Sequence, residues 1–199
     1  FISSSLALSE LFCEYKIIQW EGELVEKCEA LDIQFEPLVE GDLTIESVNG
    51  SHVDGFSDDD VKTLIIKFKT VEKVPQGLTN IFKNLQELEI SSSNLKSITG
   101  DDLQEHKNLS TLNLSGNLLT TLPSGLFENT RNLEYIDFSY NRLKYIDPDI
   151  FDDAPNLNRA FFIKNICTGD DPVYGNDRYT VQYFVEKYLL EHCRPKVEN

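Results

Sequence analysis

The 199-residue sequence has few basic residues and no long apolar run. Lysine and arginine number 18 against 34 aspartate and glutamate residues, a formal net charge of −16 at pH 7. Nucleic acid phosphates and anionic membranes bind clustered positive charge, so we expect neither as a partner. The charge attracts a basic protein, although it also serves simple solubility. No stretch approaches the roughly 20 apolar residues of a membrane span, so we expect no membrane insertion.

The sequence also lacks the motifs of common catalytic and metal centres. It has no Gly-x-Ser-x-Gly turn, no His-Glu-x-x-His motif and no phosphate-binding loop. It has no Cys-x-x-Cys pair and its histidines are scattered, so we expect no metal and no other cofactor. The run Asp58-Asp59-Asp60 lacks the ligand spacing of a calcium loop and is interpreted as a helix cap or a solvated charge run. We predict that the chain is not an enzyme.

One motif recurs through the centre of the chain. The clearest copy runs from Leu109 to Leu119 with the pattern L-x-x-L-x-L-x-x-N-x-L. Other copies open at intervals of 24 residues, at Val61, Leu85, Leu133 and Leu157. A period of about 20 to 29 residues with this pattern is the signature of a leucine-rich-repeat array. We therefore predict five such repeats over residues 61–167.

Each position of the motif has a physical role. The alternation Leu112-Asn113-Leu114 puts two side chains into the core and leaves the residue between them facing outward. One such strand cannot bury its own apolar side, so the copies must stack into a parallel sheet. The fold class predicted is an α/β repeat, a leucine-rich-repeat solenoid with a parallel concave β-sheet. Where the chain leaves the sheet, amide side chains can pair with free backbone groups: Asn117, Asn141 and Asn165.

Four cysteines lie in two local pairs at the ends of the array. Cys13 and Cys28 precede it, and Cys167 and Cys193 close it. Four cysteines allow three pairings, but a solenoid keeps its ends far apart. We therefore predict Cys13–Cys28 and Cys167–Cys193 disulfides, which imply an oxidising compartment.

Caps are predicted at both ends, within one domain. Over residues 8–60, two strand-like segments flank Gly22 as a β-hairpin closed by the first disulfide, and Leu43-Thr44-Ile45 is interpreted as a degenerate repeat. Residues 168–199 contain a helix that begins at Asn176 or Asp177. This helix either covers the last repeat, which we favour, or docks a second chain. Its apolar stripe is Val181, Phe184, Val185, Tyr188 and Leu189.

The ends and the sequons indicate export. Residues 1–7 have the character of a signal-peptide remnant cleaved after Ala7, so we expect a secreted protein. Asparagine sequons occur at Asn49, Asn108 and Asn113, which predicts a glycoprotein. Asn49 lies in a turn and is the most favourable acceptor, whereas a glycan on Asn113 would block the middle of the concave face.

The concave surface is the predicted binding surface, because most solenoids bind there. Exposed aromatic side chains are typical interface anchors. An outward apolar run at Phe161 is costly unless something covers it, and the alternative to a ligand is a loop of the C-terminal cap. The candidate ligand-binding residues are Ile65, Phe68, Glu89, Asn113, Tyr135, Asp137, Tyr140 and Phe161.

The array, its Leu-Pro-x-Gly-Leu-Phe segment ending at Phe127 and its terminal cysteine pairs resemble secreted extracellular leucine-rich-repeat proteins of the typical 24-residue class. The N-terminal part is similar to those of insects, especially flies and mosquitoes. The residues that carry this likeness are Cys13, Trp20, Cys28, Val48–His52, Asp60, Val61 and Leu64. The resemblance implies a protein-binding recognition module, with innate immunity as one setting. The alternative is a structural or adhesive matrix component or a receptor ectodomain. Homo- or hetero-oligomers through the sheet or the C-terminal helix fit either role.

Overall fold

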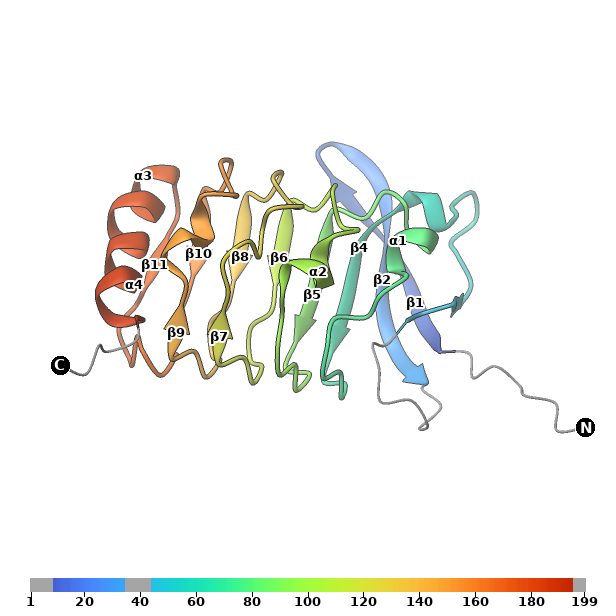
Figure 1. Ribbon diagram of the computed structural model, residues 1–199. Helices are drawn as coiled ribbons and strands as arrows, with labels where there is room; N and C mark the ends of the chain where they lie inside the picture. Colours follow the sequence, from blue (N-terminus) through green and yellow to red (C-terminus); the bar gives the residue numbers. More distant parts are fainter. Residues whose placement is uncertain (1–8, 35–43, 195–199) are drawn as a thin grey trace, which may run out of the picture.

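The computed structural model describes residues 9–34 and 44–194, which form a curved stack of strands with a cap at each end (Figure 1). Within these residues, nine strands make one sheet in the order β11-β10-β8-β6-β5-β4-β2-β1-β3. From β4 onward, each repeat adds its strand beside the strand of the preceding repeat. The members are β1 (Glu10–Trp20), β2 (Glu23–Gln34), β3 (Ser47–Asn49), β4 (Val61–Lys67), β5 (Glu87–Ser91), β6 (Thr111–Asn113), β8 (Tyr135–Asp137), β10 (Arg159–Phe161) and β11 (Tyr174–Gly175).

Short segments form the opposite, convex side of the repeats. Strands β7 (Thr121–Leu122) and β9 (Tyr145–Ile146) pair in parallel as a separate small sheet. The other segments are single turns of helix. They are η1 (Asp58–Asp60), α1 (Leu78–Ile81), α2 (Gly100–Leu103) and η2 (Pro148–Phe151).

The repeat strands pair in the predicted register. Leu88 lies opposite Leu64 on one side and opposite Leu112 on the other. Ile136 and Ala160 continue this column, and all five side chains are fully buried. Burying one such leucine or isoleucine contributes about 1.5–3 kcal/mol. These contacts confirm the predicted leucine-rich-repeat solenoid.

Buried asparagine side chains tie each of the last three repeats to the one before it. The Nδ2 of Asn141 donates to the carbonyl oxygens of Leu114 and Phe138 at 2.9 and 3.0 Å. Its Oδ1 accepts from the backbone amide of Leu119 at 3.1 Å. Equivalent bonds confirm the predicted role at the other two positions, Asn117 and Asn165.

The N-terminal cap is the predicted hairpin. Strands β1 and β2 run antiparallel and are joined by the Cys13–Cys28 disulfide. Strand β2 then pairs in parallel with β4, with Cys28 opposite Leu64. The hairpin therefore continues the repeat sheet directly and covers the open edge of its first strand.

The proposed degenerate repeat does not supply the strand beside β4 in the described part of the chain. Strand β2 occupies that place, because it pairs with β1 on one edge and with β4 on the other. Leu43 lies outside the described residues. Thr44 forms an isolated parallel bridge with Gln76, and Ile45 is buried at 2% exposure. The alternation in this segment therefore reflects the burial of Ile45 against the first repeat.

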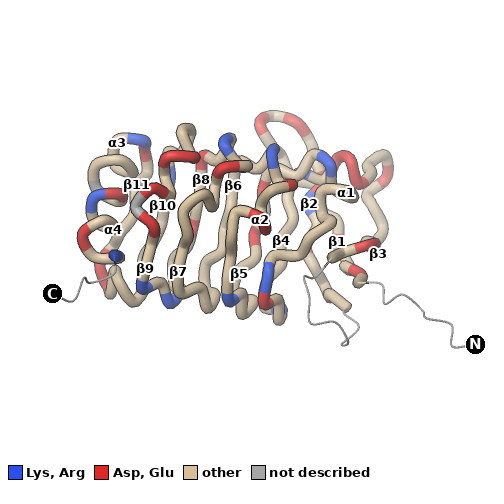
Figure 2. The backbone as a smooth tube through the Cα atoms, viewed as in Figure 1, with Lys and Arg blue, Asp and Glu red and all other residues tan. Residues whose placement is uncertain are grey.

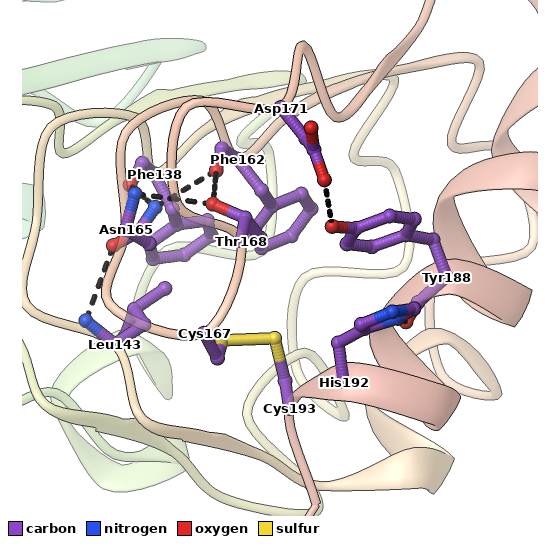
Figure 3. Close-up of a disulfide and its surroundings, with 10 residues drawn as sticks. All are labelled: Phe138, Leu143, Phe162, Asn165, Cys167, Thr168, Asp171, Tyr188, His192 and Cys193. Carbon is purple, nitrogen blue, oxygen red and sulfur yellow. Dashed lines mark hydrogen bonds between the residues drawn. A yellow bond between two sulfur atoms is a disulfide. The ribbon is translucent and has the colours of Figure 1, made fainter.

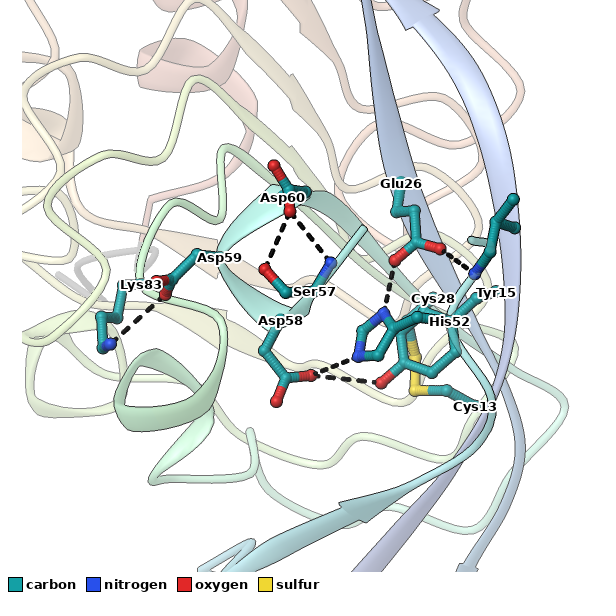
Figure 4. A network of polar contacts seen from close by, with 11 residues as sticks. Cys13, Tyr15, Glu26, Cys28, His52, Ser57, Asp58, Asp59, Asp60 and Lys83 are labelled. Carbon is teal, nitrogen blue, oxygen red and sulfur yellow. Dashed lines mark hydrogen bonds and ion pairs between the residues drawn. A yellow bond between two sulfur atoms is a disulfide. The ribbon is translucent and has the colours of Figure 1, made fainter. Parts of the chain in front are cut away.

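A buried carboxylate anchors the loop that follows β3 (Figure 4). Glu26 is fully buried and accepts from the backbone amide of Val53 at 2.7 Å. Its other oxygen lies 2.5 Å from Nδ1 of His52, whose Nε2 lies 3.1 Å from Asp58. The His52 ring also packs on Tyr15, with centroids 4.0 Å apart. These contacts hold the loop against the disulfide-linked hairpin.

The neighbouring acidic run is structural. Asp60 accepts from the backbone amide and the hydroxyl of Ser57, which closes a capping box at η1. Asp59 pairs with Lys83 at 3.3 Å. The N-cap residue is Ser57 itself, so the run contributes to a helix cap through Asp60 alone.

The C-terminal cap is a helical segment made of α3 (Arg178–Thr180), η3 (Val181–Glu186) and α4 (Lys187–His192). Asp177 caps its start, as predicted, by accepting from the amide of Thr180 at 2.8 Å. The η3 turn is π-helical, which the sequence pattern did not indicate. The Cys167–Cys193 disulfide ties the end of the helix to the last repeat (Figure 3). The buried stripe that joins the core is Val181, Val185 and Leu189.

Residues 1–8, with the expected signal-peptide remnant and its cleavage after Ala7, lie outside the described part of the chain. The side chain of Phe184 does too. In the described ranges, no helix has the length and apolar character needed to cross a membrane.

Candidate functional site

The concave face is built from the outward-pointing residues of the sheet. Because side chains alternate along a strand, partners in register on adjacent strands form rows across this face. Most of the predicted ligand-binding residues fall in one row. This central row is Glu29, Ile65, Glu89, Asn113, Asp137, Phe161 and Tyr174.

Aromatic rings from three adjacent strands touch at the C-terminal end of the face. The Tyr135 and Phe161 ring centroids lie 5.4 Å apart, and Phe161 stacks on Tyr174 at 5.9 Å. The guanidinium of Arg159 lies 5.6 Å from the Tyr135 ring centroid, which is a cation–π geometry. Burial, together with the charge of Asp137, raises the pKa of the Tyr135 hydroxyl. We call Tyr135, Phe161 and Tyr174 the aromatic surface.

Tyr174 was not a predicted site residue, because the sequence around it was interpreted as a polar loop. Strand β11 runs antiparallel to β10 and places Tyr174 opposite Phe161. The alternative explanation for Phe161 is therefore partly right, since the C-terminal cap does cover it. The covering ring is itself 44% exposed, so the apolar surface is extended. The only sequence feature that could have predicted strand β11 is the pair of a buried Val173 and an outward Tyr174. Two residues are too few to establish an alternating strand pattern.

Two further aromatic residues project where strands end. Phe68 and Tyr140 are 80% and 62% exposed. Their φ angles are +55° and +57°, a region that bulky residues adopt rarely. The same position has positive φ in every repeat and turns the chain off the sheet. Exposed rings at such positions do not serve packing and favour a role in contact with another molecule. The equivalent residues in the other repeats are Ser92, Gly116 and Lys164.

In the N-terminal half of the face, the carboxylates of Glu87 and Glu89 contact neighbouring side chains. Glu89 is only 9% exposed, accepts from the Ser91 hydroxyl at 2.7 Å and pairs with Lys67 at 3.1 Å. The Glu87 carboxylate accepts from Thr63 at 3.0 Å, and burial raises its pKa. Glu89, a predicted ligand-binding residue, is thus held by its neighbours, and its contact with a ligand stays a prediction.

Asp137 differs from these glutamates. It is half-buried between Asn113 and Phe161 in the central row. One oxygen accepts from the backbone amide of Ser139 at 2.8 Å. No lysine or arginine in the described ranges forms an ion pair with it. It therefore leaves a negative charge beside the aromatic surface.

The three sequons have different environments. Asn49 is exposed at the end of β3. Asn113 is half-buried in the middle of the concave face, where its Oδ1 accepts from the amide and the hydroxyl of Ser115 at 3.0 and 2.7 Å. Asn108 donates its Nδ2 to the carbonyl oxygen of Lys83 at 3.3 Å. Asn108 therefore already has a role between repeats.

A cavity of about 300 Å³ opens beside Tyr174, between β11 and the C-terminal helix. Val173 and Val185, which are both buried, form its apolar wall. At its rim, the Tyr188 hydroxyl donates to the carboxylate of Asp171 (Figure 3), which raises the pKa of Tyr188 to about 12. The cavity is lined by Asp171, Pro172, Val173, Tyr174, Val185 and Tyr188.

The described residues contain no group of three or more histidine, cysteine, aspartate or glutamate side chains placed to hold a metal ion. Among the described residues, the concave face offers aromatic rings, the carboxylate of Asp137, amides and hydroxyls. These groups suit non-covalent contact with another surface.

The fold and the face define a class, the leucine-rich-repeat solenoids. The family model described as "Leucine rich repeat" matches residues 60–119 and 107–159, about half of the chain. The chain therefore belongs to the leucine-rich-repeat family. No curated protein matches the sequence.

Several solved structures share the fold. One is the complex of Toll with Spatzle, described as a molecular hub in Drosophila development and innate immunity, with 18% identity over 61% of this chain and a TM-score of 0.51. Its glycosylated form has 24% identity over 62% of this chain and a TM-score of 0.50. The TLR13–ssRNA13 complex has 23% identity over 62% and a TM-score of 0.49. This chain spans 17–18% of the length of those chains. The likeness to the two Toll–Spatzle structures establishes the fold alone.

Proposed function

We propose that this chain is an extracellular recognition module that binds a protein partner through its concave face. The observation that carries the proposal is the aromatic surface, in which Tyr174 is exposed and the other two rings are half-buried. The projecting rings of Phe68 and Tyr140 extend it. Rings of this kind bury large areas at low entropic cost, and they are enriched among the residues that dominate binding energy.

An extracellular setting is supported by the two disulfides, because such bonds persist in oxidising compartments. Secretion and a role in innate immunity are part of the proposal. The role in innate immunity agrees with the description of the Toll–Spatzle complex, in which one chain shares the fold.

The proposed partner is a basic protein. Acidic residues lie along the whole solenoid in Figure 2, and the net charge of −16 favours approach of a positively charged surface. The exclusion of nucleic acids stays a prediction from this charge.

The test is capture of a partner from the native extracellular fluid, followed by binding measurements with that purified partner. The variant is Tyr135→Ser/Tyr140→Gly, which removes two concave rings. Glycine suits the positive φ at position 140, so we expect the variant to stay folded. Loss of two anchors should weaken binding at least tenfold.

The matched control is Tyr179→Ser/Tyr183→Ser. This variant removes an exposed, stacked tyrosine pair from the C-terminal helix, with centroids 4.5 Å apart. The proposal expects unchanged binding by the control. Unchanged binding by the concave variant, or equal loss in the control, would contradict it.

The alternative is an adhesive or structural matrix component, or part of a receptor ectodomain. The chain spans only 17% of the length of the chains in the Toll–Spatzle structures, which is compatible with this alternative. Light scattering over a range of protein concentrations separates the two roles. Concentration-dependent self-association favours adhesion, whereas a constant monomer mass favours recognition of a different protein.

A further inference from the structure

The aromatic surface leads from a carboxylate to a cavity. Across the sheet, the order of the central row is Asp137, Phe161 and then Tyr174. Beyond Tyr174 lies the cavity of about 300 Å³, with Asp171 at its rim. Apolar surface is therefore flanked by one carboxylate at each end.

The two carboxylates are available to a ligand. The hydrogen bonds that they accept come from neutral groups, the backbone amide of Ser139 for Asp137 and the hydroxyl of Tyr188 for Asp171. The nearby cations are engaged elsewhere: Lys164 pairs with Asp170, and Arg159 lies over the Tyr135 ring. In the described ranges, neither Asp137 nor Asp171 forms an ion pair.

The size of the cavity limits what can enter. A volume of about 300 Å³ lies at the low end of cavities that hold ligands. It fits one bulky apolar side chain better than a larger molecule. Its wall is apolar, and the adjacent Tyr174 ring is 44% exposed, so an aromatic side chain can be buried in the cavity and stack at its entrance.

We propose that this end of the concave face binds a protein segment in which a bulky aromatic side chain is flanked by basic residues. The aromatic side chain fills the cavity beside Val185, and the basic residues face Asp137 and Asp171. A second copy of this chain is disfavoured as the occupant, because each copy carries a net charge of −16. The inference rests on the proposed function and specifies the chemistry of the partner.

The test uses three short peptides of defined sequence as probes. Acetyl-Lys-Trp-Lys-amide carries the proposed features, acetyl-Glu-Trp-Glu-amide reverses the charge, and acetyl-Lys-Ala-Lys-amide lacks the aromatic ring. Methyl NMR of Val173 and Val185 reports on occupancy of the cavity. We expect saturable shifts of these methyl signals with the first peptide and at least tenfold weaker binding of the other two.

Three variants locate the interaction. Asp137→Asn and Asp171→Asn should each lower the affinity for acetyl-Lys-Trp-Lys-amide about two- to fivefold, the range of exposed charge pairs. The difference in affinity between this peptide and acetyl-Glu-Trp-Glu-amide should therefore become smaller. Tyr145→Ser, on the convex strand β9, should change nothing. Thermal unfolding of each variant checks that the fold is intact.

Equal binding of all three peptides, or no shift at Val173 and Val185 up to millimolar peptide, would overturn the inference. So would dimerisation that Tyr174→Ser abolishes, because a second copy would then be the occupant. These outcomes are distinct from failure of the proposed function. Capture that depends on Tyr135 and Tyr140 can persist while the peptides fail, and the reverse is equally observable.

Discussion

The side-chain amide of Asn132 donates to the carbonyl oxygen of Lys107 at 3.0 Å, on the outside of the solenoid. Asn132 stands directly before the opening leucine of its repeat, and the bond reaches back into the preceding repeat. The same bond recurs in the other repeats, so an exposed asparagine ladder accompanies the buried one. Its other members are Asn84, Asn108 and Asn156.

The two ladders should contribute unequally to stability. Asn141→Ala leaves buried backbone groups without partners, and we expect it to lower the free energy of unfolding by roughly 2–4 kcal/mol. Asn132→Ala exposes the Lys107 carbonyl to water, which can replace the lost donor, so less than about 1 kcal/mol is expected. Urea unfolding of both variants measures the difference. Equal losses would show that burial does not set the value of these bonds.

The C-terminal disulfide should stabilise the cap substantially. It closes a loop with a sequence separation of 26 residues, for which loop entropy gives about 3 kcal/mol. We expect Cys167→Ser/Cys193→Ser to unfold at lower denaturant concentration and its C-terminal helix to exchange amide hydrogens faster. Unchanged protection of Val185 and Leu189 would show that packing alone holds the helix.

His106 should make the fold sensitive to acid. The side chain is 3% exposed and its Nδ1 has no hydrogen-bond partner. Burial lowers its pKa to about 4 from 6.5, so the unfolded chain takes up the proton first. Its contribution to stability is complete above pH 6.5 and is lost as the pH falls toward 4.

His106→Leu removes this dependence. Phe82, Thr130 and Ala154 occupy the same repeat position, which suits an apolar side chain. Relative to the value at pH 7.5, the wild type should lose about 2–3 kcal/mol more than the variant at pH 4.5. The comparison cancels the many carboxylates that both proteins share. Parallel pH profiles of the unfolding free energy would refute the assignment.

The sequons should differ in occupancy. We expect glycan on Asn49, which is exposed at a strand end, and less on Asn108, whose amide donates to Lys83. Glycopeptide mass spectrometry of protein from a eukaryotic secretory host measures this order. A fully occupied Asn113 would place sugar at the middle of the concave face and restrict partners to its C-terminal end.

The repeat and the bridges were predictable because they depend on local, periodic burial. The 24-residue spacing of Leu64, Leu88 and Leu112 is enough to predict their buried column. Because the two ends of a solenoid are far apart, each cysteine can pair only with the cysteine at its own end. Asp137, Phe161 and Tyr174 form one surface because β11 turns back antiparallel to β10, a pairing with no periodic signal.

The sequence also did not predict which acidic residues form ion pairs or which strand lies beside β4. Glu89 forms an ion pair with Lys67 in the neighbouring strand. The alternation of inward and outward residues does not predict ion pairs between strands. Likewise, β2 lies beside β4 where the degenerate repeat was expected, because this hairpin strand pairs with β1 on one edge and with β4 on the other.

Site-specific photocrosslinking tests most directly whether the concave face binds a protein partner. A p-benzoylphenylalanine residue is placed at Tyr140 on the concave side or at Tyr145 in the convex strand β9, and each protein is irradiated with the captured partner. The account predicts a crosslink from position 140 and none from position 145. Crosslinking from position 145 alone, or equally from both positions, would contradict it.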